Sequence, residues 1–289
     1  MIAKIKENAK RALAGNWGKA IAILLILFAV SMLFVFFEAL FYWIFQFTGR
    51  TGPVLSLDFI PPDYPLLSAA RTIRLAPQLV SLASMSCGLL VLSPLSLGVT
   101  QWYYRTAGGE PADASAVFQF FSQRGLYFKS VWYHVQITVR SFLWGVLLFA
   151  PGLTLFALCS YYLERPGENE NLQLTALSFG LVLSCVLLVL CALVLILVLL
   201  RYFLTPYYLV HRPELTVSQA IRLSIRGTRE QKGNLLLFGL SFLPWMLLGL
   251  LVLPLLYVLP YLMASRALYA KVLITREERR EPEEDMEEE

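Results

Sequence analysis

Apolar residues in this chain form long uncharged runs, and short polar or basic segments separate these runs. The clearest run, 176–200, contains no charged residue. An α-helix rises about 1.5 Å per residue, so ~20 apolar residues can cross the core of a bilayer. The pattern therefore predicts an all-α, multi-pass transmembrane helical bundle. The predicted spans are 20–46, 78–103, 141–163, 173–200, 235–252 and 255–273.

The last two spans come from one apolar run, 235–273, which three prolines interrupt. As a single helix it would measure ~58 Å, about twice the thickness of the hydrocarbon core, so a hairpin turning near Pro254 is the alternative. With six spans, 20 Lys and Arg residues lie on the side of the N-terminus and 4 on the other, whereas five spans give 15 and 9. Because positive charge concentrates on the cytoplasmic side, we predict six spans with both termini cytoplasmic.

Three segments outside the spans combine apolar and basic residues at helical spacing: 2–14, 115–133 and 216–232. In the third, Thr216 and Gln219 have the spacing of a capping box, and an apolar stripe lies opposite a basic one. We predict that all three helices lie in the membrane interface. Each precedes two predicted spans, which suggests three repeated units. The alternative is that any hairpin bundle with a basic inner side gives this pattern.

Composition and charge agree with a membrane protein that has a distinct tail. Hydrophobic residues make up 57% of the chain and the mean hydropathy is +0.63. The net charge of +4 combines a basic body with the acidic segment 277–289. We expect one membrane domain, 1–276, that contacts anionic headgroups on the cytoplasmic side, and a disordered tail, 277–289, that could bind a basic protein partner.

The sequence contains no recognisable catalytic or ligand-binding motif. Its two histidines have no carboxylate at ligand spacing, and its four cysteines lie singly in apolar runs. We therefore expect no enzymatic activity, no metal or other cofactor and no nucleic-acid partner. Glu38 is an isolated acid within the first span, and we interpret it as solvated or snorkelling near the outer interface.

Two sets of residues remain as candidate sites. The first set would anchor the chain at the membrane interface: Trp17, Lys19, Arg105, Arg140, Arg201, Arg222, Arg226, Arg229 and Lys271. The second set would break helices and could open a cavity: Pro94, Pro151, Gly152, Pro206, Pro244, Pro254 and Pro260.

Six short motifs in order along the chain resemble the bacterial membrane-protein family called domain of unknown function 975. The first is the opening Lys6–Ile21 with Gly15-Asn16-Trp17. The others are Ser93–Gly98, Phe149–Gly152, Pro206–Val210 followed by Pro213-Glu214, Ala220–Ser224 and Pro260–Ala264. The chain differs from shorter members in having 53 residues between Gly152 and Pro206. The resemblance implies a bacterial inner-membrane location and assigns no reaction.

Two functional hypotheses follow. The first is a non-enzymatic accessory or scaffold protein in membrane organisation or assembly, because buried charges are scarce and three surface helices are expected. The second is a transporter or lipid-handling protein with a cavity between proline-broken helices. A closed core would favour the first hypothesis, and a cavity between paired helices would favour the second.

Overall fold

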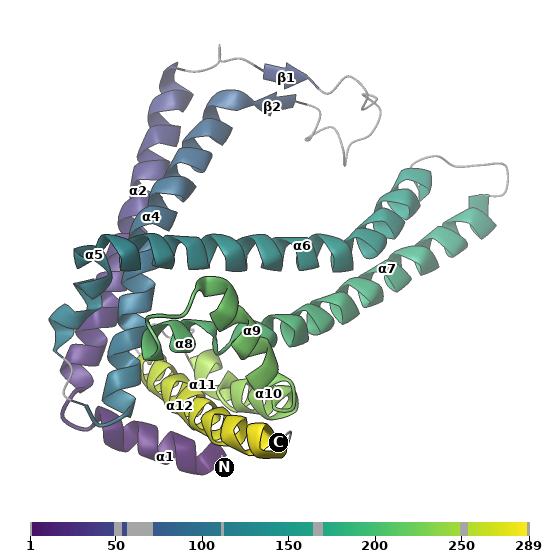
Figure 1. The fold of residues 1–289 in the computed structure, drawn as a ribbon. Helices are drawn as coiled ribbons and strands as arrows, with labels where there is room; N and C mark the ends of the chain where they lie inside the picture. Colours follow the sequence, from purple (N-terminus) through teal and green to yellow (C-terminus); the bar gives the residue numbers. More distant parts are fainter. Residues whose placement is uncertain are drawn as a thin grey trace. The chain divides into compact units, whose positions relative to one another are not determined.

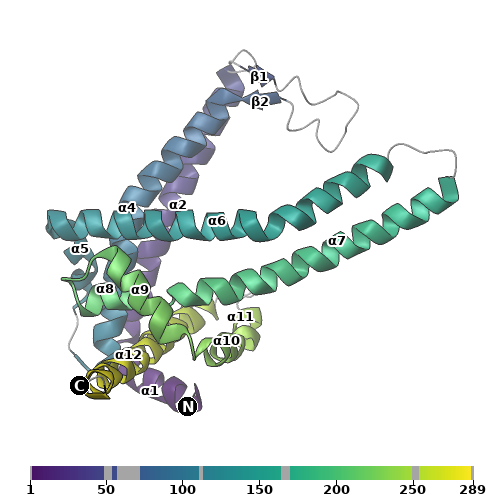
Figure 2. The same ribbon diagram turned by 45° about the vertical axis from the view of Figure 1, so that its right-hand side comes forward.

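The computed structural model describes residues 2–48, 54–56, 72–110, 113–163, 170–248 and 254–287 (Figures 1 and 2). The long helices are α2 (Trp17–Thr48), α4 (Leu75–Ala107), α6 (Arg124–Leu163), α7 (Glu170–Leu199) and α12 (Leu255–Glu287). The shorter ones are α1 (Ile2–Leu13), α5 (Gln119–Ser122), α8 (Thr205–His211), α9 (Val217–Thr228), α10 (Lys232–Leu240) and α11 (Leu243–Leu248), with the 3-10 turns η1 (Ala114–Phe118) and η2 (Leu200–Tyr202). In the described part of the chain, β1 (Val54–Ser56) and β2 (Thr72–Arg74) form the one pair of strands.

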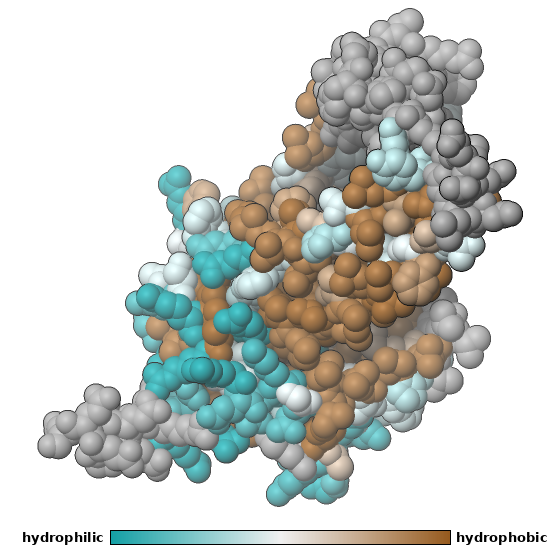
Figure 3. Space-filling model, turned by 90° about the vertical axis from the view of Figure 1, so that its right-hand side faces the viewer, coloured by the Kyte–Doolittle hydropathy of each residue, from teal (hydrophilic) through white to brown (hydrophobic). Residues whose placement is uncertain are grey.

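Four helical segments are long and apolar enough to cross a membrane: Trp17–Phe41, Leu79–Ala107, Arg124–Leu163 and Leu174–His211. They expose large apolar side chains, such as Phe142 at 68% and Phe179 at 70%. Hydrophobic side chains also cover broad areas of the face drawn in Figure 3. Water would solvate such a surface poorly, whereas lipid chains match it, so this is a membrane protein.

The helices divide into two compact units. A packed unit contains Met1–Leu33, Gly88–Ile137 and Leu199–Glu289, and a hairpin unit contains Phe34–Cys87 and Thr138–Val198. In the hairpin unit, the antiparallel strands pair Val54 with Arg74 and join the end of α2 to the start of α4 (Figure 1). This unit also contains most of α6 and α7, which approach closely at glycines. A Cβ atom added to Gly152 would lie 2.7 Å from Leu188 Cδ2.

The packed unit has a closed aromatic core. Trp102, Tyr103, Phe242 and Tyr269 are at most 1% exposed, and Phe238 and Tyr269 lie 4.9 Å apart between ring centroids. The hydroxyl of Tyr103 donates to the backbone carbonyl of Ala20 at 3.2 Å, which connects α4 to α2. Large rings of this kind bury much apolar surface, so the core stabilises the short helices that surround it.

Two of the predicted surface helices are present. Helix α1 buries Ile5, Ala9 and Leu13 and ends where Gly15 adopts a left-handed conformation with φ +81°. Helix α9 begins with the expected capping box, in which the Thr216 N–H donates to Gln219 Oε1 at 2.8 Å. Its apolar residues pack into the core of the protein, while its arginines are exposed.

The prediction of a third, separate surface helix at 115–133 is wrong. The segment 115–133 folds as η1, α5 and the first turns of α6, and α6 then continues through 141–163 without a break. The stretch 126–144 contains neither proline nor glycine, so nothing in the backbone ends the helix there.

The last apolar run also differs from the expected pair of spans. Within its described residues, α10 has 9 residues and α11 has 6, and both are shorter than a membrane crossing. The nitrogen of Pro244 cannot donate to the carbonyl of Leu240, four residues earlier, which is where α10 ends. Pro254 directly precedes α12, and Pro260 lies inside it.

The tail is helical where we predicted disorder from residue 277. Helix α12 continues to Glu287. Two contacts explain its first part: Glu277 pairs with Arg226 at 3.3 Å and Glu278 with Arg212 at 2.8 Å. Glutamate and arginine are also good helix formers, so the helix can extend beyond these contacts.

Candidate functional site: an apolar groove with one glutamate between α2 and α4

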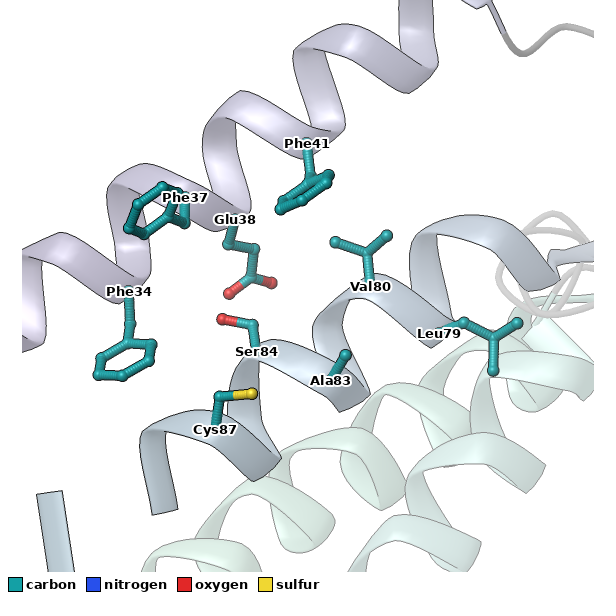
Figure 4. Close-up of a pocket in the computed structure, with 9 residues that line it drawn as sticks. All are labelled: Phe34, Phe37, Glu38, Phe41, Leu79, Val80, Ala83, Ser84 and Cys87. Carbon is teal, nitrogen blue, oxygen red and sulfur yellow. The ribbon is translucent and has the colours of Figure 1, made fainter. Parts of the chain in front are cut away.

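An apolar groove of about 560 Å³ lies in the hairpin unit, between α2 and α4. It is lined by Phe34, Phe37, Glu38, Phe41, Leu79, Val80, Ala83, Ser84 and Cys87 (Figure 4). Its volume falls within the ~300–1,000 Å³ of pockets that bind small molecules. The groove therefore has room for part of an amphipathic ligand.

Helical spacing brings these side chains together. Phe34, Glu38 and Phe41 are four and three residues apart on α2, and Val80, Ser84 and Cys87 have the same spacing on α4. Residues at these intervals lie on one face of a helix. Each helix therefore contributes one stripe to the groove, and the strand pair connects the two helices beyond it.

Glu38 is the acidic side chain among these apolar walls. The Ser81 hydroxyl donates to Glu38 Oε1 at 2.7 Å, and in Figure 4 the carboxylate points toward the hydroxyl of Ser84. A carboxylate accepts about four hydrogen bonds, so the serine contact satisfies only part of its capacity. An incoming group that donates hydrogen bonds or carries positive charge would complement it.

The three phenylalanines add to this preference. Phe34 is half-buried, while Phe37 is 45% and Phe41 48% exposed, so their rings remain accessible beside the carboxylate. Aromatic faces attract cations, and their apolar surface also suits an alkyl chain. Together with Glu38 they form a site suited to an amphiphile with an ammonium or amide head.

The interpretation of Glu38 as a snorkelling side chain missed this groove. The spacing of Glu38 from the phenylalanines was visible in the sequence, but the facing stripe of α4 was not. None of the seven residues predicted as helix breaks lines the groove. Pro94 and Pro151 lie inside continuous helices, and Pro206 occupies the first turn of α8, where a missing N–H costs little.

Several predicted anchors make contacts inside the packed unit. Trp17 stacks on Tyr257 with ring centroids 4.7 Å apart, and the Lys271 ammonium lies 5.6 Å from the ring centroid of Tyr104. Lys19 is exposed, as are the α9 arginines, whereas Arg105, Arg140 and Arg201 are half-buried. Among the predicted anchors of the packed unit, Arg226 and Arg229 border one hollow between α9 and α12.

A charged cluster joins α12 to α8 in the packed unit. Glu278 Oε1 lies 2.8 Å from Arg212 and 3.1 Å from His211 Nε2. Burial by itself would raise the pKa of the Glu278 carboxyl, but the hydrogen bonds from Arg212 and His211 outweigh this effect and lower the pKa. This cluster contributes to holding the end of α12 in place.

Lys6 holds α1 against the junction of α10 and α11. Its ammonium donates to the Ser241 carbonyl at 2.9 Å and lies 4.1 Å from the centroid of the Phe242 ring. Burial, followed by the charge of Lys10, lowers the pKa of Lys6. These two contacts hold α1 against the packed unit.

Comparison with known proteins identifies a family without assigning a reaction. No curated protein and no solved structure matches the chain. The family model described as "Protein of unknown function (DUF975)" matches residues 1–277, nearly the whole length. Three of the motifs that suggested this family contribute the core residues Tyr207, Ile221 and Tyr261, and the matched range also includes the residues that line the groove. The chain is a member of the DUF975 family.

Proposed function

We propose that this protein is a lipid-handling protein of the membrane, which binds an amphipathic ligand in the groove between α2 and α4. The ligand would place its apolar chain against Phe34, Phe37 and Phe41 and a cationic or hydrogen-bond-donating head at Glu38. This proposal corresponds to the second hypothesis from the sequence. The walls of the groove, however, are continuous stretches of helix, whereas that hypothesis expected helices broken by proline.

The observation that supports the proposal is the partly satisfied carboxylate in an apolar groove. Glu38 lies within the candidate span Trp17–Phe41, and a charge at membrane depth is costly unless a partner compensates it. Ser81 supplies one hydrogen bond at 2.7 Å. The head of the ligand would supply further hydrogen-bond donors. The apolar chain of the ligand would leave water and bury its surface against the apolar walls of the groove, which also favours binding.

We also propose a multi-pass topology in the bacterial plasma membrane with both termini cytoplasmic. The 20 to 4 split of Lys and Arg supports this orientation. Four spans give the same split as six, because both numbers are even and leave 201–289 on the inner side. The charge count therefore supports the orientation but does not distinguish these two numbers of spans.

A second candidate is the accessory or scaffold role, and the closed aromatic core of the packed unit favours it. That core buries its large side chains completely and provides a rigid body for contact with other proteins or anionic headgroups. In both proposals the protein acts by binding, and we expect no catalytic activity.

The groove can be tested through Cys87, which lines it and is exposed. In a protein whose other three cysteines are alanine, maleimide labelling of Cys87 would be measured in a non-ionic detergent with dodecylamine or dodecanol. We expect the amine to protect Cys87 at concentrations about tenfold lower than the alcohol, because a hydrogen bond to a charged group contributes ~1.5–3 kcal/mol. Glu38→Gln should abolish this difference.

Two controls keep the test specific. Glu7→Gln removes a carboxylate that pairs with Arg11 and does not line the groove, so it should leave the preference for the amine unchanged. A protein with Cys185 as its single cysteine, also exposed, reports general shielding by the detergent. Equal protection by amine and alcohol, or a preference that survives Glu38→Gln, would contradict the proposed role of Glu38.

A further inference from the structure

A second hollow, of about 220 Å³, lies in the packed unit between the end of α9 and α12. Arg226 and Arg229 border it from the α9 side, and Arg276 and Glu277 from α12. The two helices lie side by side in Figures 1 and 2. Tertiary packing thus places arginines that are about 50 residues apart in the chain around one hollow.

The charges around this hollow do not balance. Glu277 is only 13% exposed and pairs with Arg226 Nε at 3.3 Å. Within the described part of the chain, Arg229 and Arg276 make no ion pair, and both are exposed. Glu230 also lines the hollow, so three arginines face two glutamates and a positive surplus remains.

Stabilisation of a helix end accounts for only part of this surplus. Cations near the C-terminus of a helix offset a partial charge of about −0.5, and Arg226 and Arg229 occupy this position on α9. Arg276 lies on another helix, eleven residues before its end, and has no such role. The next helix, α10, begins beside the hollow directly after Gln231, and no side chain caps its first turn.

We propose that this hollow binds a phosphate-bearing group, with Arg229 and Arg276 as its principal ligands. A guanidinium donates two parallel hydrogen bonds to phosphate oxygens, and two of them from different helices would enclose one phosphate. Uncapped N–H groups at a helix start favour the same anion. The group is the phosphate of an anionic lipid or of a soluble phosphate monoester. This site is independent of the groove at Glu38, so either proposal can fail without the other.

The test compares two variants with the same change in charge. Arg229→Gln/Arg276→Gln removes the proposed ligands, whereas Arg222→Gln/Arg279→Gln removes two exposed arginines that do not line the hollow. The full-length proteins are placed in nanodiscs of phosphatidylcholine, with or without phosphatidylglycerol. Inorganic phosphate or glycerol phosphate is added to the phosphatidylcholine discs in further samples.

Binding of each phosphate-bearing ligand is measured as the rise in unfolding temperature that the ligand causes. Binding of phosphatidylglycerol is measured independently, as the lipid that the protein retains in native mass spectrometry. We expect the ligand variant to lose about tenfold or more in affinity, since it loses charge-assisted hydrogen bonds, and the control to stay within about twofold. A response to phosphatidylglycerol alone identifies a lipid headgroup, and a response to soluble phosphate identifies a monoester. Equal responses of both variants, or no binding by the unmodified protein, would overturn the proposal.

Discussion

Gly98 of α4 lies against the backbone of η1, and the structure predicts that even alanine at this position destabilises the protein. A Cβ atom at Gly98 would lie 1.8 Å from the backbone oxygen of Val117. Real Cβ atoms stay at least 3.0 Å from such an atom, so the backbone at η1 would have to move by more than 1 Å. A backbone cannot rotate away as a side chain can, so the substitution must displace η1 from α4.

The expected cost can be worked out from two opposing effects. Overpacking a core typically costs about 1–3 kcal/mol and occasionally more, whereas replacing glycine by alanine inside a helix contributes about 0.5–1 kcal/mol of stability. Because the obstruction is backbone, we expect the upper part of the first range and a net loss of about 2 kcal/mol for Gly98→Ala. This corresponds to a fall in unfolding temperature of the order of 5 °C.

Gly145→Ala provides the matched control. Gly145 also lies inside a long helix, and nothing would approach its Cβ atom within 4 Å. Only the gain in helix propensity applies there, so the unfolding temperature should stay equal or rise. Thermal unfolding of both variants in detergent, followed by tryptophan fluorescence, gives the comparison. The reasoning about Gly98 would be refuted if Gly98→Ala were as stable as Gly145→Ala.

Three further predictions concern the packed unit. Ending the chain at Arg280 should leave the unfolding temperature unchanged, whereas ending it at Arg276 should lower that temperature. The shorter chain loses the two glutamates that pair with α8 and α9. Equal stability of the two truncated proteins would contradict a stabilising role of those pairs. Lys6→Met should destabilise by about 1–3 kcal/mol in thermal unfolding, since a partly buried carbonyl loses its charged donor, while exposed Lys4→Met should have little effect. The pKa of Glu278 is lowered on folding, so its contribution to stability is present above the unfolded pKa and is lost as pH falls through the folded pKa. The protection of α12 amides around Glu278 from hydrogen exchange, measured relative to the intrinsic exchange rate at each pH, should therefore fall in acid, and a Glu278→Gln protein should not show this fall.

The family motifs of the sequence have structural explanations that the sequence alone did not provide. Gly98 ends one motif and permits the close approach to η1. Ser224 ends another, and its hydroxyl donates to the Arg201 carbonyl at 2.8 Å while accepting from the Leu204 N–H at 3.1 Å. Tyr207 and Tyr261 follow prolines in two further motifs and are both buried. These motifs therefore determine packing.

Local patterns determined the features that depend on neighbouring residues. Uncharged runs predicted the long helices α2, α4 and α7 because crossing a bilayer requires only length and apolarity. The capping box at Thr216 followed from the spacing of Thr216 and Gln219 within one helical turn. Family membership also followed from the order of short motifs along residues 1–277.

Features that depend on distant residues were decided only by the tertiary structure. The acidic segment gained helical order at Glu277 and Glu278 because their partners lie on α9 and α8, more than 50 residues earlier. The groove at Glu38 required α4 to present its serines to α2. Hydrophobic periodicity identifies the face of a helix that is apolar or polar, but it contains no information about which helix will pack against that face.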